Sequence, residues 1–162
     1  MADAGWCSLL REKLTLAGQL VRIEQEQGHG APSVMKREAL TQGAVALLAE
    51  ARRILLRLVA ESACGEVGDV DSLATLRARV GDQPGEVQVL SAAAADGNSW
   101  WTRLDALLGR QQEPGRRPTQ PRQEELIAVA PAGPDASPEA LQSLISEFRD
   151  YFEAFIERHD QW

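Results

Sequence analysis

The chain has 162 residues, of which 44% are hydrophobic and 25% are charged, and its 17 Lys and Arg against 24 Asp and Glu give a formal net charge of −7. This composition excludes intrinsic disorder over most of the chain. A chain of this length buries roughly 68–70% of its unfolded surface, so neither a metal ion nor a disulfide is needed to hold its core together. We predict a single soluble domain over residues 1–162.

Apolar residues at intervals of three and four predict an all-α fold. The first helix is expected over 4–27 and ends before a Gly-His-Gly turn. The second helix, which is the longest, is expected over 33–63 with Ser33 as its N-cap. Its apolar residues cover more than one face, so we expect the other helices to pack around it.

Two short helices are expected next, over 70–80 and 85–95, separated by the turn sequence GDQPGE. A fifth helix is expected over 98–112, with Asn98 or Ser99 as its N-cap. These elements fill the acidic middle of the chain.

Residues 113–137 contain five prolines, a composition typical of a linker, and within them we expect ELIAVA to dock across the helices as an extended strand. The last helix is predicted over 138–160, with Ser137 as its N-cap and Pro138 in its first turn. The predicted architecture is a bundle of about four long helices, with two short helices and a Pro-rich linker.

The aromatic residues allow two interpretations. Trp100 and Trp101 point about 100° apart on a helix, so both are buried only if that helix is enclosed. Otherwise one of them is exposed and can anchor a protein partner. Tyr151, Phe155 and the other aromatic residues of the last helix either close the core or present an aromatic face to a partner. Trp162 at the C-terminal end, like an exposed Trp100 or Trp101, either anchors a partner or lies along the rim with its indole N–H in water.

Arg52, Arg53 and Arg57 form a basic cluster on the second helix, where five Lys and Arg stand against three Glu. Such a cluster binds phosphates or an acidic partner. In the alternative interpretation, the arginines pair with the acidic last helix or are simply solvated. The overall acidity of the chain argues against nucleic-acid binding.

No motif for nucleotide binding or nucleophilic catalysis is present. Glu26 and His29 have the ExxH spacing of di-iron bundles, but those sites need two such pairs and two further glutamates. The sequence therefore predicts no catalytic residue, no metal site and no cofactor.

Cys7 and Cys64 have no regular spacing and are predicted to be buried thiols in a reducing compartment. The start of the chain lacks the basic residues of an export signal. The most apolar stretch, 44–60, contains Glu50 and three arginines, which excludes a membrane-spanning helix. We expect a cytoplasmic protein that does not associate with membranes.

The order of these features resembles a family of uncharacterised helical proteins from gammaproteobacteria. The resemblance rests on the alanine- and leucine-rich second helix, the fragments SWWTRL and IAVA, the Pro-rich linker and the final amphipathic helix, and it covers nearly the whole chain. The Gly-His-Gly turn departs from the family pattern, as does the second helix, where Ala, Leu and Ile replace the expected aromatic residues. The resemblance implies an all-helical fold and carries no activity or site, since the family has none assigned.

The absence of catalytic motifs favours a non-enzymatic interaction or adaptor protein that binds another protein, or a second copy of itself, through an exposed helical face. The residues expected at this surface are Trp100, Trp101, Arg52, Arg53, Arg57, Tyr151, Phe155 and Trp162. One alternative is a bundle whose core holds a small apolar ligand or a metal ion, with Cys7, Cys64, Tyr151 and Arg57 as inward polar groups. A weaker alternative is nucleic-acid contact through Arg52, Arg53 and Arg57.

Overall fold

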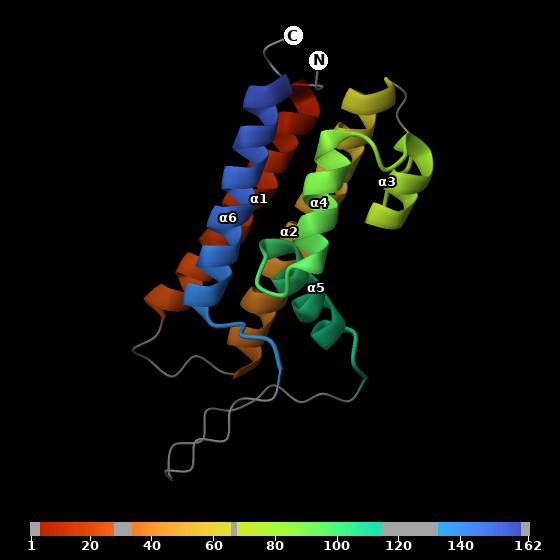
Figure 1. Cartoon of the computed structure of the whole chain (residues 1–162). Helices are drawn as coiled ribbons and strands as arrows, with labels where there is room; N and C mark the ends of the chain where they lie inside the picture. Colours follow the sequence, from red (N-terminus) through yellow and green to blue (C-terminus); the bar gives the residue numbers. More distant parts are fainter. Residues whose placement is uncertain (1–3, 28–33, 66–67, 115–132, 160–162) are drawn as a thin grey trace.

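The computed structural model describes residues 4–27, 34–65, 68–114 and 133–159. Across these ranges the helices are joined by turns and coil and no strand is present, which confirms the predicted all-α fold (Figure 1). The helices are α1 (Ala4–Glu26), α2 (Val34–Cys64), α3 (Leu73–Val80), α4 (Gly85–Ala95), α5 (Trp100–Gln111) and α6 (Pro138–His159). Each predicted boundary lies within three residues of the observed one. The predicted strand ELIAVA, the Ser33 cap, His29 and Trp162 lie outside the described residues.

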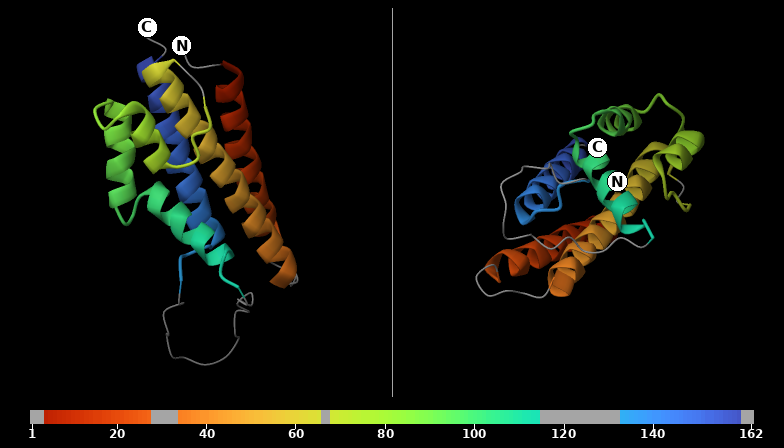
Figure 2. Two further views of the ribbon diagram at one scale, coloured as in Figure 1. Left: turned by 90° about the vertical axis from the view of Figure 1, so that its right-hand side faces the viewer. Right: turned by 90° about the horizontal axis from the view of Figure 1, so that it is seen from below.

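The helices pack around α2, as its wide apolar surface predicts. α1 and α2 form an antiparallel hairpin, and α6 lies beside α1 and runs antiparallel to it (Figure 1 and Figure 2). α2 contacts α1, α3, α5 and α6. α4 packs between α3 and α5 and contacts both of them. Among the described residues, none of the helices is long and apolar enough to cross a membrane.

Serine side chains fix where three of the helices begin. The Oγ atoms of Ser72, Ser99 and Ser137 accept hydrogen bonds from the backbone N–H groups three residues later, at 3.1, 3.2 and 3.3 Å. These bonds satisfy donors that a helix start otherwise leaves unpaired. The structure thus confirms the predicted Ser137 cap and selects Ser99 rather than Asn98 at the start of α5.

An aromatic stack joins α5 to α6 at the centre of the bundle. The rings of Trp100 and Phe148 lie 4.1 Å apart at an angle of 9°, and Trp101 meets Trp100 edge-on at 5.4 Å. Phe148, Phe152 and Phe155 are the largest fully buried side chains. The aromatic residues of α6 therefore close the core, including Phe155.

The expectation that one tryptophan of the adjacent pair reaches the surface is wrong, because Trp100 and Trp101 are each only 5% exposed. α5 is in contact with α2, α4 and α6. Trp100 stacks on α6, whereas Trp101 lies under the guanidinium of Arg52 on α2. The two tryptophans point about 100° apart on α5, and both are buried because α6 covers Trp100 and α2 covers Trp101.

The prediction of two buried thiols is correct for Cys7 and wrong for Cys64. Cys7 belongs to the core, whereas Cys64 is exposed, and the two are not joined by a disulfide. The difference arises because Cys64 is the last residue of α2 and lies beyond the buried segment that ends at Ala60.

We predict that Phe148→Ala lowers the free energy of unfolding by about 3–5 kcal/mol, because it removes the ring stacked on Trp100 and leaves a cavity. Urea unfolding followed by circular dichroism measures this change. Val89→Ala, at a side chain that is 46% exposed, is the control, and its effect should stay within about 0.5 kcal/mol. Equal losses for both variants would contradict a central role for the stack.

We predict that a thiol reagent reacts rapidly with Cys64 in the native protein and with Cys7 only on unfolding, because reaction requires access to the sulfur. Absorbance measurements with Ellman's reagent count the fast and slow thiols. Cys64→Ser should abolish the fast phase, and Cys7→Ser should leave it unchanged. A fast phase that survives Cys64→Ser would show that Cys7 is accessible.

Candidate binding site

The three arginines predicted as a cluster have different neighbours. Arg52 forms an ion pair with Asp105 of α5, with Nη1 and Oδ1 2.5 Å apart, and its guanidinium covers Trp101. Arg53 points to Asp69, which precedes α3. Arg57 lies over the ring of Trp6 on α1. Among the described residues these partners come from α5, α1 and the segment before α3, so the expected pairing with the acidic last helix is wrong.

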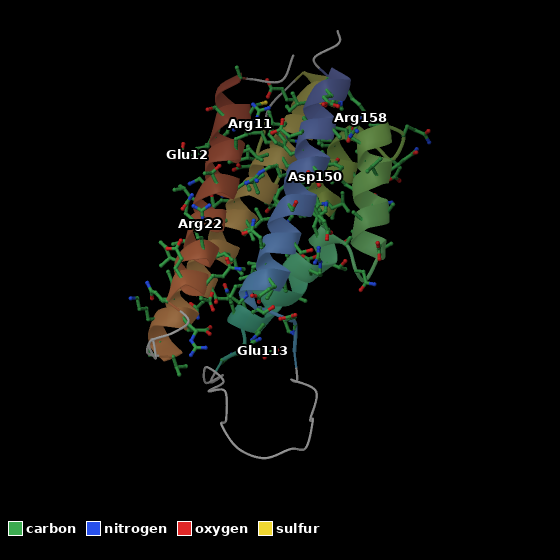
Figure 3. All side chains as sticks on the ribbon, turned by 90° about the vertical axis from the view of Figure 1, so that its left-hand side faces the viewer. Arg11, Glu12, Arg22, Glu113, Asp150 and Arg158 are labelled. Carbon is green, nitrogen blue, oxygen red and sulfur yellow. The ribbon has the colours of Figure 1, made fainter. Side chains whose placement is uncertain are left out.

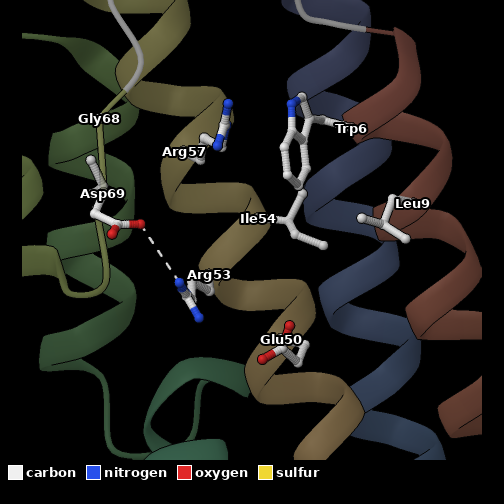
Figure 4. A pocket seen from close by; sticks show the side chains of 9 residues that line it. Trp6, Leu9, Glu50, Arg53, Ile54, Arg57, Gly68 and Asp69 are labelled. Carbon is white, nitrogen blue, oxygen red and sulfur yellow. Dashed lines mark ion pairs between the residues drawn. The ribbon is translucent and has the colours of Figure 1, made fainter.

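Arg53 and Arg57 line a pocket of about 170 Å³ between α1, α2 and the segment before α3. Figure 4 shows Arg57, Arg53 and Glu50 following one another along α2, with Trp6 on one side and Asp69 on the other. The spacing of three and four residues places these α2 side chains on one face of the helix. Leu9, Ile54 and Val70 supply the apolar part of the wall. We call this the Trp6 pocket.

The guanidinium of Arg57 is held at the wall of the Trp6 pocket by stacking. Its Cζ atom lies 4.0 Å from the centroid of the Trp6 ring, a cation–π contact. The Nε atom of Arg57 is buried and has no hydrogen-bond partner within the described part of the chain. A buried donor without an acceptor is costly, so the contact with Trp6 carries an energetic penalty at Nε.

The ion pair of Arg53 with Asp69 is weak. Its Nη2 and Oδ1 atoms are 3.6 Å apart, and the side chains are 56% and 94% exposed. Exposed ion pairs contribute at most about 1 kcal/mol. Water or a competing anion can therefore separate the pair easily.

A further guanidinium lies beside the pocket wall at Gly68. A Cβ atom built on Gly68 would overlap the guanidinium of Arg79, so the arginine passes directly over this backbone. The absence of a side chain at Gly68 is what permits this approach. Guanidinium groups from α2 and α3 thus lie at the pocket together with the carboxylates of Glu50 and Asp69.

A second polar cluster holds α6 against α4, around the carboxylate of Glu86. Tyr151 Oη donates a hydrogen bond of 2.9 Å, Arg158 donates bonds of 2.7 and 3.1 Å from Nε and Nη2, and His159 Nε2 lies 3.6 Å away. Figure 3 shows Arg158 on the part of α6 that faces α4. The hydrogen bonds of Tyr151 and Arg158 to Glu86 fasten the two helices together, whereas His159 Nε2 forms no hydrogen bond within the described residues.

The cluster changes the pKa values of its members. Burial by itself would raise the pKa of Glu86, but the hydrogen bonds from Arg158 and Tyr151 and the charges of Arg158 and His159 outweigh it and lower the pKa. Burial, reinforced by the neighbouring Glu86 carboxylate, raises the pKa of Tyr151. Glu86 is therefore charged and Tyr151 neutral near pH 7.

The structure divides the predicted surface residues into three groups. Trp100, Trp101 and Phe155 lie in the core, so they do not form an exposed face. Tyr151 is bound to Glu86 and Arg52 to Asp105. Arg53 and Arg57 reach the Trp6 pocket, while Trp162 lies outside the described residues.

Sequence reasoning missed Trp6, Glu50 and Asp69 as members of the pocket. The spacing of Glu50 with the two arginines was visible in the sequence, whereas no local signal links Trp6 or Asp69 to them. Within the described ranges, no group of three or more His, Cys, Asp or Glu side chains is placed to hold a metal ion.

Comparison with known proteins identifies the family. The model of a family of unknown function (DUF6586) matches residues 11–162. The chain belongs to this family. No curated protein and no solved structure matches it. The matched range includes Arg53, Arg57 and Asp69 and begins after Trp6 and Leu9.

We predict that Glu86→Gln lowers the free energy of unfolding at pH 7 by about 1–2 kcal/mol, because charge-assisted hydrogen bonds to Tyr151 and Arg158 are weakened. The pKa of Glu86 is lowered in the folded state from its ordinary value of 4.5. Its contribution to stability is therefore present above about pH 4.5 and is lost as the pH falls through the lower folded-state pKa. The difference between wild type and variant should shrink over that range.

Urea unfolding between pH 7 and pH 3 tests this expectation. Glu12→Gln, at an exposed position of α1, is the matched control and should change stability little at any pH. A difference between wild type and Glu86→Gln that stays constant down to pH 3 would contradict a role for the charged carboxylate.

Proposed function

We propose that this protein is a non-enzymatic adaptor that binds an acidic segment of a partner protein at the Trp6 pocket. The observation that carries the proposal is the pair of guanidinium groups from Arg53 and Arg57, which line one pocket on a chain of net charge −7. The side chains that line the pocket are basic, acidic, aromatic and aliphatic, a combination that suits the binding of a partner.

The composition of the pocket fits protein recognition. Trp and Arg are enriched among the residues that dominate binding energy at protein interfaces. The pocket also combines apolar with charged side chains, as protein interfaces do, with Leu9, Ile54 and Val70 beside the arginines and carboxylates. An acidic segment is repelled by most of this acidic chain and attracted to the pocket, which favours one docking position.

The proposal includes a cytoplasmic location, which fits two cysteines that are not joined by a disulfide. A second copy of the chain is also acidic and is the alternative occupant in a homodimer. Nucleic-acid contact has less support, because Arg52 is already paired with Asp105 and does not line the pocket.

A second candidate function is the binding of a small ligand. The pocket volume of about 170 Å³ favours this candidate, since it accommodates a molecule of a few atoms as well as a protein side chain. The ligand would then lie in the Trp6 pocket at the margin of the bundle rather than in its core.

The adaptor role is tested by charge reversal. The double variant Arg53→Glu with Arg57→Glu should bind the partner at least about tenfold more weakly, because it replaces attraction by repulsion at the pocket. The matched control, Arg22→Glu with Arg149→Glu, changes the net charge equally at exposed positions away from the pocket, and its affinity should change less than about threefold.

Affinity capture from lysate identifies the partner, and calorimetry with the purified partner then measures its affinity for the three proteins. Circular dichroism confirms that both variants are folded. Equal binding by the wild type and the pocket variant would overturn the proposal, and self-association lost only in the pocket variant would replace the partner with a second copy.

A further inference from the structure

We infer that the Trp6 pocket takes a carboxylate group, and that Asp69 occupies the place of this group on Arg53 when the pocket is free. The inference rests on the proposed function and names the chemistry of the bound group: the side-chain carboxylate of an acidic residue in the partner. The inference follows from a difference between the two arginines. Arg53 has an ion-pair partner in Asp69, whereas the Nε atom of Arg57 has no hydrogen-bond partner among the described residues.

Arg57 presents an edge that suits a carboxylate. Stacking on Trp6 covers one flat face of its guanidinium, with 4.0 Å between Cζ and the ring centroid. The guanidinium therefore makes its hydrogen bonds in its own plane, where the buried Nε donor has no partner among the described residues. Carboxylates bind guanidinium groups in this plane, and because Nε is buried, the carboxylate bonds to Arg57 through its Nη atoms.

Arg53 shows the same chemistry with an internal carboxylate. Asp69 reaches it at 3.6 Å while remaining 94% exposed. The next residue, Val70, is buried at 3% exposure and anchors the backbone, so the Asp69 side chain can leave without moving α3. A ligand carboxylate can therefore take the place of Asp69 on Arg53 while the segment before α3 stays in position.

The acidic side chains of the pocket favour a carboxylate over a phosphate. A singly charged carboxylate that displaces Asp69 leaves the charge next to Arg53 unchanged. A phosphate would bring up to two negative charges close to Glu50 and Asp69, which both line the pocket. The apolar wall of Leu9, Ile54 and Val70 fits the methylene groups that carry a glutamate carboxylate.

Nuclear magnetic resonance of the ¹⁵N-labelled full chain tests the inference through the indole N–H signal of Trp6. Trp6→Phe identifies this signal among those of the four tryptophans. The probe is N-acetylglutamate amide, and its uncharged counterpart is N-acetylglutamine amide at the same ionic strength. We expect a saturable shift of the Trp6 signal with the glutamate compound and no saturable shift with the glutamine compound.

Two variants on the arginine side separate a binding role from a general charge effect. Arg57→Gln should weaken binding of N-acetylglutamate amide at least about tenfold, because it removes a charged donor pair. Arg52→Gln removes the same charge from the same helix outside the pocket and should change the affinity less than about twofold. Equal effects of the two variants would overturn the inference.

Asp69→Asn is the sharpest variant, because the inference predicts that it strengthens binding. Without the internal carboxylate, N-acetylglutamate amide should bind about two- to fivefold more tightly, in line with the small contribution of an exposed ion pair. If Asp69 only supported the pocket wall, Asp69→Asn would weaken the binding of N-acetylglutamate amide instead of strengthening it. Weaker binding by Asp69→Asn, or tighter binding of inorganic phosphate than of the glutamate compound by the wild type, would overturn the inference.

The outcomes distinguish this inference from the adaptor proposal. If the glutamate compound binds as expected and no partner depends on Arg53 and Arg57, the carboxylate site stands and the adaptor role fails. If a partner depends on both arginines while the glutamate and glutamine compounds behave alike, the adaptor role stands and the carboxylate assignment fails.

Discussion

Ten apolar side chains of α2 are buried, and they point toward more than one side of the helix. No single neighbour can cover them, so α1, α3, α5 and α6 all pack against α2. A helix enclosed in this way leaves only narrow margins for its polar residues. The arginines of α2 lie in these margins, where their long stems pass over apolar surface and their guanidinium groups reach toward solvent.

Two of these margins contain the same pair of residue types. Arg52 lies over Trp101 of α5, with its Cζ atom 4.7 Å from the ring centroid, and Arg57 lies over Trp6 of α1 at 4.0 Å. Asp105 neutralises Arg52, whereas the Nε atom of Arg57 has no acceptor in the described ranges. The same contact is therefore joined to an ion pair at one margin of α2 and lacks an acceptor for Nε at the other.

The sequence predicted what depends on local spacing. Helical periodicity located all six helices, and Ser137 marked the start of α6, because both signals are contained within a few turns of chain. The burial of both Trp100 and Trp101 depends on α2 and α6, which enclose α5 from two sides. No pattern within α5 could have predicted that outcome.

The pocket was only partly predictable for the same reason. Arg53 and Arg57 were identified from their spacing on α2, and that spacing places them on one face. Trp6 and Asp69 come from segments far apart in the sequence and meet the arginines only through the packing of α1 and α3 on α2.

The carboxylates of α6 pair with arginines of α1 and α5 rather than with Arg52, Arg53 or Arg57 of α2. Glu153 pairs with Arg11 of α1 at 2.8 Å, and Glu147 pairs with Arg103 of α5 at 2.6 Å. These arginines come from the helices that α6 contacts most closely, so the acidic helix is neutralised there rather than by α2. Arg53 and Arg57 face Glu50 and Asp69, both of which are exposed. Because α6 is neutralised elsewhere, the guanidinium groups of Arg53 and Arg57 stay at the Trp6 pocket, where two carboxylates balance their charge.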